Sequence, residues 1–211
     1  MEQAQDVYRL FGAPGAGSAS VEAALELLGL PYEHVEAAPW GEENDDTREL
    51  RLINPLGQVP ALVLPDGSVM TESVAILLYL AGRRPDHPAA HTTVNDPWVL
   101  RWLMFVATNV YTAIGVGDYP ERWVASEAAR GELKEGALER IRQSWRIMDE
   151  HGARGPYVAG SQLTLLDLYV ATMSHWRPGR SWFDENCPRL AACVANTEAD
   201  ETVRRVWSRH F

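Results

Sequence analysis

The first third of the chain alternates between the apolar spacing of strands and that of helices. A β-prone run at residues 7–11 leads into a turn-forming segment at 12–17, and apolar side chains then recur at helical spacing over 21–28. Gly29 and Pro31 follow, and both residue types end helices. We therefore expect a strand, a loop and a helix in this order.

Short elements continue this alternation up to residue 83. The sequence predicts a second strand, a short helix, a hairpin and a closing helix, at residues 32–37, 46–52, 61–64 with 68–71, and 73–83. Pro65-Asp66-Gly67 supplies the turn of the hairpin. This order fits a small mixed sheet with helices on its faces, in which the first three elements form a right-handed crossover.

The pattern changes after residue 84. Residues 85–97 are rich in Pro, His and Asp and have no apolar period, which is typical of an interdomain linker. The sequence beyond them is typical of helices, with a buried helix expected at 98–114 and a helix with one polar face at 126–151. Thr164 and Asp167 have the spacing of an N-terminal capping box.

Composition supports a division into two domains. Residues 1–84 carry 13 acidic side chains against 5 arginines, whereas seven of the eight tryptophans lie beyond residue 97. We expect an α/β domain at 1–84, a linker at 85–97 and an all-helical domain at 98–211.

The overall charge limits the kinds of partner. The 211 residues carry a formal net charge of -10, with 46% hydrophobic and 23% charged residues, so we expect a globular protein that does not bind nucleic acid. The N-terminus lacks the basic and apolar regions of a signal peptide, and we expect no membrane-spanning stretch. These features predict a cytoplasmic protein without membrane attachment.

Metal and disulfide chemistry is not expected. Cys187 and Cys193 are the only cysteines, and a spacing of six places them on different faces of a helix. His87 and His91 are four residues apart, but Pro88 interrupts the helical face that a metal-binding pair would use. We read all four as ordinary structural side chains.

Two segments could recognise a small peptide. If the bond from Val59 to Pro60 is cis, the backbone of Val59 faces outward and can pair with an extended peptide, although the segment could equally be a structural turn. Between a strand and a helix, Ser73 can offer a hydroxyl and a backbone N–H to a carboxylate, and Glu72 can accept from an ammonium. The simpler alternative is that Ser73 only caps the helix.

Four motifs at this spacing resemble the glutathione transferase family over nearly the whole chain. They are Ala13-Pro-Gly-Ala-Gly-Ser18, Asn54-Pro-Leu-Gly-Gln-Val-Pro60, Thr71-Glu-Ser-Val-Ala-Ile-Leu-Leu-Tyr-Leu80 and Gly160-Ser-Gln-Leu-Thr-Leu-Leu-Asp-Leu168. The resemblance implies a thioredoxin-like N-terminal domain that binds glutathione, an all-helical C-terminal domain that lines a pocket for an apolar electrophile, and a homodimer. It assigns the glutathione site to Val59, Pro60, Glu72 and Ser73.

The loop before the first long helix departs from the family pattern. It looks most like the bacterial beta class, but Gly17 stands where that class has a cysteine, and only Tyr8 could serve in place of the activating tyrosine of other classes. We therefore expect Ser18 and the helix N-terminal amides to activate the thiol, with Ser20 as a weaker candidate. The alternative is that Ser18 is only an N-cap. The beta-class lysine near Glu36 is missing as well, which leaves Trp40 as the candidate donor to the glycyl carboxylate.

The resemblance favours an enzyme that conjugates the glutathione thiolate to small hydrophobic electrophiles, as in detoxification. Phe105, Tyr111 and Tyr119 are the candidate wall of the electrophile pocket, although such aromatic residues could also be ordinary core. Two alternatives remain open. One is a glutathione-dependent isomerase, lyase or peroxidase, and the other is a non-catalytic glutathione-binding stress or scaffold protein.

Overall fold

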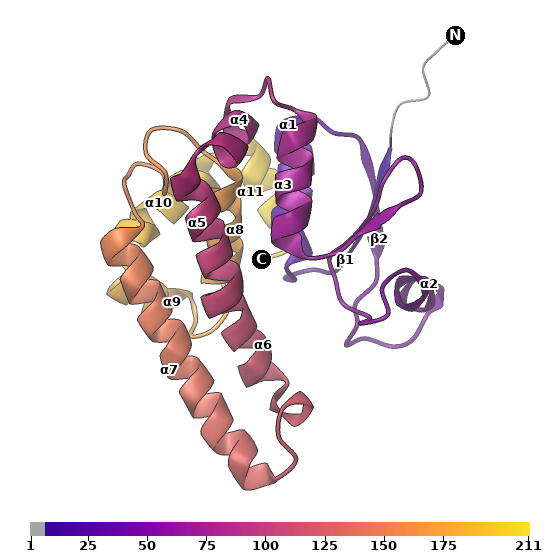
Figure 1. Ribbon diagram of the computed structural model, residues 1–211, viewed down its shortest axis with the longest axis vertical. Coiled ribbons are helices and arrows are strands. Elements are labelled where there is room, and N and C mark those ends of the chain that lie inside the picture. The colour runs from indigo at the N-terminus through magenta and orange to yellow at the C-terminus, as the bar shows by residue number, and fades with distance from the viewer. Residues whose placement is uncertain (1–6) are drawn as a thin grey trace. The chain divides into compact units, whose positions relative to one another are not determined.

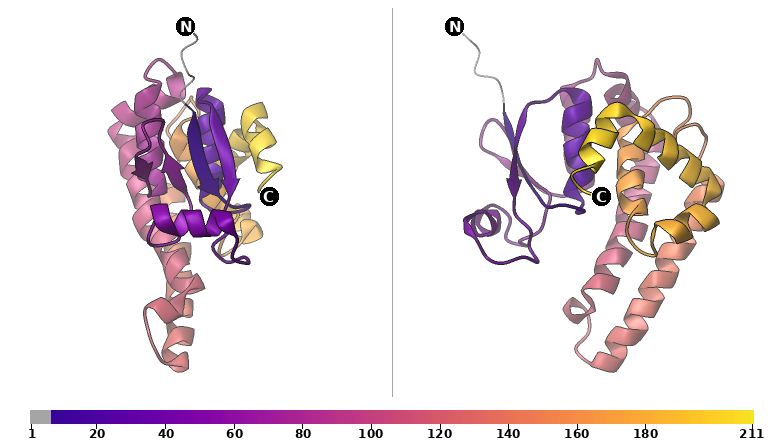
Figure 2. Two further views of the ribbon diagram at one scale, coloured as in Figure 1. Left: turned by 90° about the vertical axis from the view of Figure 1, so that its right-hand side faces the viewer. Right: turned by 180° about the vertical axis from the view of Figure 1, so that it is seen from behind.

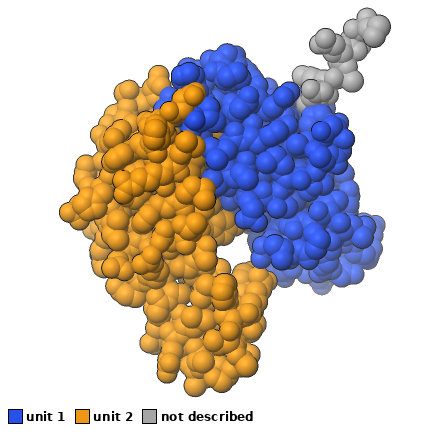
Figure 3. All heavy atoms as spheres, viewed as in Figure 1, with its two compact units in different colours: residues 1–94, 198–211 blue, residues 95–197 orange. Residues whose placement is uncertain are grey.

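The computed structural model describes residues 7–211, and its chain forms two compact units (Figure 3). The first unit contains residues up to Val94 together with Glu198–Phe211, and the second contains Asn95–Thr197. The C-terminal segment thus belongs with the first unit, which differs from the expected division at 84 and 97. Ionic and apolar contacts between residues almost 190 positions apart cause this difference, and sequence spacing cannot reveal them.

A four-stranded sheet forms the centre of the first unit, in the order β2, β1, β3, β4 (Figure 1). Strand β1 pairs in parallel with β2 and antiparallel with β3, and β3 pairs antiparallel with β4. The strands are β1 (Tyr8–Gly12), β2 (Tyr32–Glu36), β3 (Ala61–Val63) and β4 (Val69–Met70). The predicted mixed sheet and its hairpin are confirmed within one or two residues.

Helices cover both faces of this sheet. α1 and α3 lie together on one face and α2 lies on the other (Figures 1 and 2). α1 ends where predicted, because Gly29 adopts a left-handed conformation with φ 63° and the Leu30 N–H reaches the carbonyl of Leu25. The helices of this unit are α1 (Ser18–Leu28), α2 (Asp45–Ile53), α3 (Ser73–Arg83), α4 (Pro88–Asn95, whose last residue falls in the second unit) and α11 (Glu201–Trp207).

One of these helices was not anticipated, and another belongs to a different unit from the one expected. The segment expected to be a linker contains α4, which begins at Pro88 and buries Ala89, Ala90 and Thr93. Proline at the first helical position carries no N–H that the helix would need, so it starts a helix as readily as it marks a linker. α11 packs against α1 and closes the first unit.

The second unit is helical around a core of large aromatic side chains. Trp102, Trp145, Tyr169 and Phe183 are completely buried. At the start of α8 the predicted capping box is present, with the backbone N–H of Thr164 donating to Asp167 at 2.8 Å. The longer elements are α5 (Pro97–Phe105), α6 (Thr112–Asp118), α7 (Glu127–His151), α8 (Leu165–Ser174), α9 (Arg180–Asn186) and α10 (Pro188–Ala199).

The buried helix predicted at 98–114 has an irregular centre. A π-helical turn, η1 (Val106–Tyr111), joins α5 to α6. By length and composition, the stretch Pro97–Asp118 could cross a membrane, and 18 consecutive residues within it have a mean hydropathy of 1.4. Val99, Trp102 and Val106 are fully buried, as in the core helix of a folded domain.

Both cysteines are free and buried within the second unit. Burial raises the pKa of Cys187 to about 12 and that of Cys193 to about 11, so both thiols stay protonated near neutral pH. Neither is a candidate nucleophile.

Candidate functional site

Strand register brings three predicted segments to one end of the sheet. Phe11 lies opposite Ala61 at the C-terminal end of β1, and Met70 lies opposite Leu62 in β4. Because β3 runs antiparallel to both neighbours, the loop after β1, the turn before β3 and the residues after β4 all leave the same edge. The 13–17 loop, Val59-Pro60 and Glu72-Ser73 are therefore neighbours in space.

Val59 offers an unpaired backbone at this edge. Its side chain is 9% exposed and packs in the same core cluster as Ala13 and Ala16 of the loop. The bond to Pro60 is cis, which is the condition under which we expected the Val59 backbone to face outward. Among residues 7–211, no hydrogen bond uses the backbone N–H or C=O of Val59. Buried backbone groups are almost always paired, so this pair of groups points to an extended peptide ligand.

Asn54 fixes the turn that presents Val59. Its side-chain amide donates to the Gln58 carbonyl at 2.8 Å, and its side-chain oxygen accepts from the Leu56 N–H at 3.2 Å. Its backbone carbonyl accepts from the N–H of Gly57, which has a φ of 60°. Asn54 is buried, so a single side chain holds the turn from inside.

Glu72 has a strained backbone. Its φ of 64° is the one positive value among the described residues other than glycine. Its side chain is exposed and forms no ion pair within residues 7–211. Backbone strain of this kind costs about 1–3 kcal/mol and is concentrated at functional sites. The adjoining Ser73 is buried and begins α3, so a carboxylate acceptor stands directly beside a helix N-terminus.

Ser18, the predicted activating residue, begins α1. Its side chain is completely buried, its Oγ accepts from the Ala13 N–H at 3.1 Å, and its hydroxyl donates to the Ala13 carbonyl at 3.3 Å. Ser18 therefore closes the loop between β1 and α1. Ser20 is also buried, and its hydroxyl donates to the Gly17 carbonyl, three residues earlier, at 2.9 Å.

Tyr8 does not reach the loop. It begins β1, whereas the loop follows the other end of that strand. Burial, followed by the neighbouring Tyr79, raises the pKa of Tyr8, so its phenol is neutral near neutral pH. Tyr8 was the tyrosine considered for thiol activation, and at this end of β1 it does not supply a donor to the loop.

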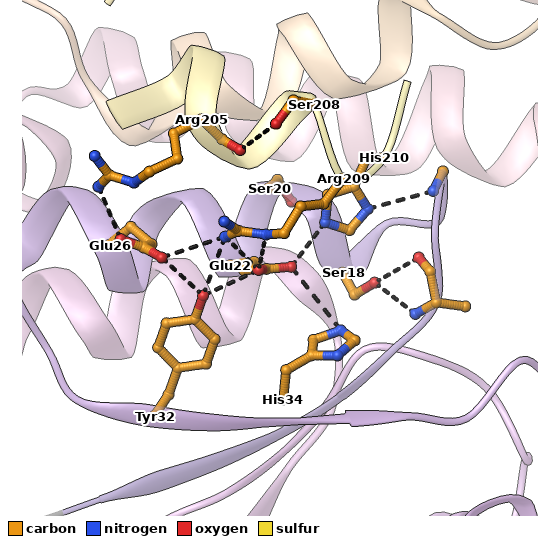
Figure 4. Close-up of polar contacts among 12 residues, drawn as sticks. Ser18, Ser20, Glu22, Glu26, Tyr32, His34, Arg205, Ser208, Arg209 and His210 are labelled. Carbon is orange, nitrogen blue, oxygen red and sulfur yellow. Dashed lines mark hydrogen bonds and ion pairs between the residues drawn. The ribbon is translucent and has the colours of Figure 1, made fainter. Parts of the chain in front are cut away.

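A buried charge cluster, which the sequence did not predict, lies behind the loop (Figure 4). Glu22 of α1 is at its centre and accepts from Arg209 at 2.6 Å and from Tyr32 of β2 at 3.0 Å. His210 contacts the other carboxylate oxygen at 2.7 Å. The cavity beside this cluster has a volume of about 470 Å³ and is lined by Pro14, Glu22, Glu26, Tyr32, His34, Glu36, Arg209 and His210.

The protein environment keeps Glu22 ionised. Burial alone would raise the pKa of this carboxyl, but the hydrogen bonds from His210, Arg209 and Tyr32 outweigh burial and lower it to about 2. Burial and the two carboxylates Glu22 and Glu26 raise the pKa of Tyr32, so its phenol remains a donor. Among the described residues, no three His, Cys, Asp or Glu side chains form a group that could hold a metal ion.

The aromatic residues predicted to line an apolar pocket have different neighbours within the second unit. Tyr111 ends the π-helical turn, and its ring centre lies 5.1 Å from that of Trp176. Phe105 packs on Trp102 at 4.9 Å. Arg122 stacks on the Tyr119 ring, with its guanidinium carbon 4.0 Å from the ring centre. Tyr111 therefore belongs to an aromatic cluster that includes Trp176, which the sequence did not single out.

The chain is similar to several known proteins. A family model described as "Glutathione S-transferase, N-terminal domain" matches residues 18–83. The chain is 35% identical over 184 residues to "Uncharacterized GST-like protein YncG" of Escherichia coli (strain K12), covering 87% of this chain and 89% of that protein.

Two further relatives extend the similarity. "Glutathione S-transferase GstA" of Escherichia coli O157:H7 is 30% identical over 173 residues, covering 80% of this chain and 81% of that protein. A sphingomonad glutathione S-transferase solved in complex with glutathione aligns with a TM-score of 0.78 at 25% identity, covering 95% of this chain and 97% of that chain.

Proposed function

The chain belongs to the glutathione S-transferase family, and from that premise we propose that it binds reduced glutathione and conjugates its thiolate to small apolar electrophiles. The observation that carries the binding proposal is the unpaired backbone of Val59 at the same sheet edge as the exposed, strained Glu72. The Val59 backbone could pair with the middle residue of an extended tripeptide, and Glu72 could bind the charged group at one of its ends.

The chemistry of glutathione matches the groups at this edge. The Val59 N–H and C=O would pair with the cysteinyl backbone, in the manner of an added strand. The γ-glutamyl end carries one ammonium and one carboxylate, for which Glu72 supplies an acceptor, and Ser73 with the start of α3 supplies donors. Pro60 keeps the turn free of a backbone donor at the next position.

The conjugation step needs a thiolate held close to an electrophilic carbon. Sulfur forms a bond to that carbon, the leaving group departs with its electron pair, and the thiol proton passes to solvent. The protein contributes a lowered thiol pKa and proximity of the two reactants. We assign thiol activation to Ser18 and the amides at the start of α1, and the apolar wall to Phe105, Tyr111 and Tyr119.

Calorimetry with reduced glutathione tests the binding proposal. Wild-type protein should release or absorb heat on titration and should gain thermal stability at millimolar glutathione. Glu72→Ala should weaken binding by about tenfold or more, because the ammonium loses its charged acceptor. Glu132→Ala, at an exposed position on α7, is the matched control and should bind normally. Absence of both heat and stabilisation in the wild type would refute the proposal.

A non-catalytic glutathione-binding protein is the second candidate, and the position of Ser18 favours it. The loop lacks a cysteine at Gly17, and the Ser18 hydroxyl is occupied by Ala13. Activity assays with aromatic halides, epoxides, enals and peroxides, after binding has been confirmed, separate this candidate from a transferase. The same panel, extended to isomerisation and lyase substrates, identifies the remaining enzyme alternative.

We also propose a cytoplasmic homodimer. Leu52 and Leu56 flank the turn that presents Val59 and are 84% and 69% exposed. Apolar side chains exposed to this degree are typical of a protein interface. Light scattering should give twice the mass of one chain, and Leu56→Glu should shift the protein toward the single-chain mass. Reduced glutathione is maintained in the cytosol, which is the compartment we expect.

A further inference from the structure

Residues 208–211 follow α11, and His210 in this segment contacts the loop between β1 and α1. His210 is 2% exposed and uses both of its ring nitrogens. The Gly15 N–H donates to Nδ1 at 3.3 Å, and Nε2 lies 2.7 Å from Oε2 of Glu22 (Figure 4). One imidazole thus joins the middle of the loop to the most buried carboxylate of α1.

The partners of His210 indicate which ring nitrogen accepts a hydrogen bond and which donates one. A backbone N–H can only donate, so Nδ1 accepts and carries no proton. Nε2 then carries the hydrogen and donates a hydrogen bond to the Glu22 carboxylate. Arg209 holds the same carboxylate through its other oxygen, Oε1, at 2.6 Å, so Glu22 is fixed from two directions.

Other hydrogen bonds support the two ends of the loop. The Ala16 N–H donates to the Ala13 carbonyl, and the Ser18 hydroxyl group bonds to Ala13. These bonds close the two ends of the loop, whereas Gly15 lies at its middle with φ 69°. At this middle position, the Gly15 N–H donates to Nδ1 of His210.

We propose that His210 is a positioning residue for the thiol-binding loop 13–17. It holds the Gly15 N–H through Nδ1, and Glu22 holds its ring in place. The inference rests on the proposed function, because the loop has this role only if glutathione binds at the adjoining edge. His210 acts on the reaction through the loop backbone and does not contact the reacting sulfur.

Two substitutions separate the two hydrogen bonds of His210. The side-chain oxygen of His210→Asn occupies the place of Nδ1, so this variant keeps an acceptor for Gly15 and loses the contact with Glu22. The amide of His210→Gln reaches the place of Nε2, so this variant keeps Glu22 and loses Gly15. His210→Ala loses both contacts.

Hydrogen exchange of the Gly15 amide measures positioning without reference to glutathione. We expect exchange about three- to tenfold faster in the Gln and Ala variants and within twofold of wild type in the Asn variant. The thiol pKa of bound glutathione, read from ultraviolet absorbance, should rise in the Gln and Ala variants only. The value of kcat at saturating glutathione should fall by about three- to tenfold in the same two variants.

The results distinguish failure of the proposed glutathione binding from failure of the role proposed for His210. If wild type does not bind glutathione, the proposed function fails, and this inference fails with it. If wild type binds and His210→Gln matches it in exchange, thiol pKa and kcat, the inference alone fails. If His210→Asn is as impaired as His210→Ala, the contact with Glu22 is the important one and the positioning of Gly15 is refuted.

Discussion

Glu22 and Arg209 are separated by 187 positions in the chain, yet their carboxylate and guanidinium groups lie 2.6 Å apart. Glu22 belongs to α1 and Arg209 follows α11, so this ion pair ties the C-terminal segment to the first helix. The Glu22 side chain is 5% exposed and also accepts from Tyr32 and His210. A buried carboxylate is stable only with such partners.

The first prediction concerns acid unfolding. Glu22 has a folded pKa of about 2, below the value near 4 expected in the unfolded chain. Its contribution to stability is therefore complete above pH 4 to 5 and is lost as pH falls toward 2. A shift of about two units corresponds to about 3 kcal/mol.

Urea unfolding between pH 7 and pH 2.5 checks this expectation. Wild type should lose stability over the acid range by more than Glu22→Gln does, and Glu22→Gln should already be less stable at pH 7. Glu201→Gln, at an exposed acid of α11, serves as the control. Parallel pH curves for wild type and Glu22→Gln would show that this carboxylate is not the titrating group.

The second prediction is that Glu72 lowers the stability of the fold but strengthens glutathione binding. Glycine adopts φ 64° without strain, so Glu72→Gly should raise the free energy of unfolding by about 1 kcal/mol. The same variant should bind glutathione about tenfold or more weakly, because the carboxylate is gone. Chemical unfolding and calorimetry on one preparation measure both effects. A variant that is less stable, or one that binds normally, contradicts this account.

The sequence predicted the elements of the sheet because their determinants are local. Gly29 ended α1 and the Pro65-Asp66-Gly67 turn placed the hairpin, and each acts over a few residues. The sequence left open whether the bond before Pro60 is cis, and the structure has it cis. Val59, Glu72 and Ser73 were grouped through the family resemblance, and the strand register brings their segments to the same end of the sheet.

The contacts of the C-terminal segment could not be predicted in this way. His210 and Gly15 are 195 positions apart, and neither the period nor the composition near residue 210 shows which helix it meets. The burial of Ser18 was missed for a related reason. An N-cap serine and a catalytic serine have the same sequence pattern, and only the positions of Ala13 and Gly12 decide where the hydroxyl points.

The third prediction concerns Gly12, whose α-carbon lies between two side chains. A Cβ at this position would lie 2.8 Å from Oγ of Ser18 and 2.9 Å from Nε2 of His34. Gly12→Ala should therefore destabilise the protein by about 1–3 kcal/mol, because one of these side chains must move. Thermal unfolding measures this effect. Gly12→Ala combined with His34→Ala should recover part of the loss, and no recovery would assign the clash to Ser18.

The fourth prediction is that Tyr111 contributes to binding of the electrophile and not to binding of glutathione. Tyr111 packs edge-on against Trp176 and Tyr169, with ring centres 5.1 and 6.3 Å away. Tyr111→Ala should raise KM for an apolar electrophile severalfold while glutathione affinity stays within twofold, since an aromatic contact contributes about 1 kcal/mol. Tyr111→Phe keeps the ring and should behave like wild type. Equal effects on both reactants would remove Tyr111 from the electrophile wall.

The final prediction concerns thiol activation by Ser18. The hydroxyl donates to the Ala13 carbonyl at 3.3 Å, which is longer than a typical O–H···O bond, so a thiolate is the stronger acceptor. A hydroxyl donor stabilises the thiolate more than the thiol and therefore lowers the thiol pKa. Ser18→Ala should raise the pKa of bound glutathione and slow the reaction by roughly ten- to hundredfold, from the loss of about 1.5–3 kcal/mol.

The same substitution also tests the role of Ser18 in closing the loop. Without the hydroxyl, the buried Ala13 N–H loses its acceptor, and stability should fall by about 1–3 kcal/mol. Ser18→Cys keeps a weak donor and acceptor and is the matched variant. A loss of stability with unchanged thiol pKa and rate would show that Ser18 only closes the loop, and it would assign activation to the backbone amides at the start of α1.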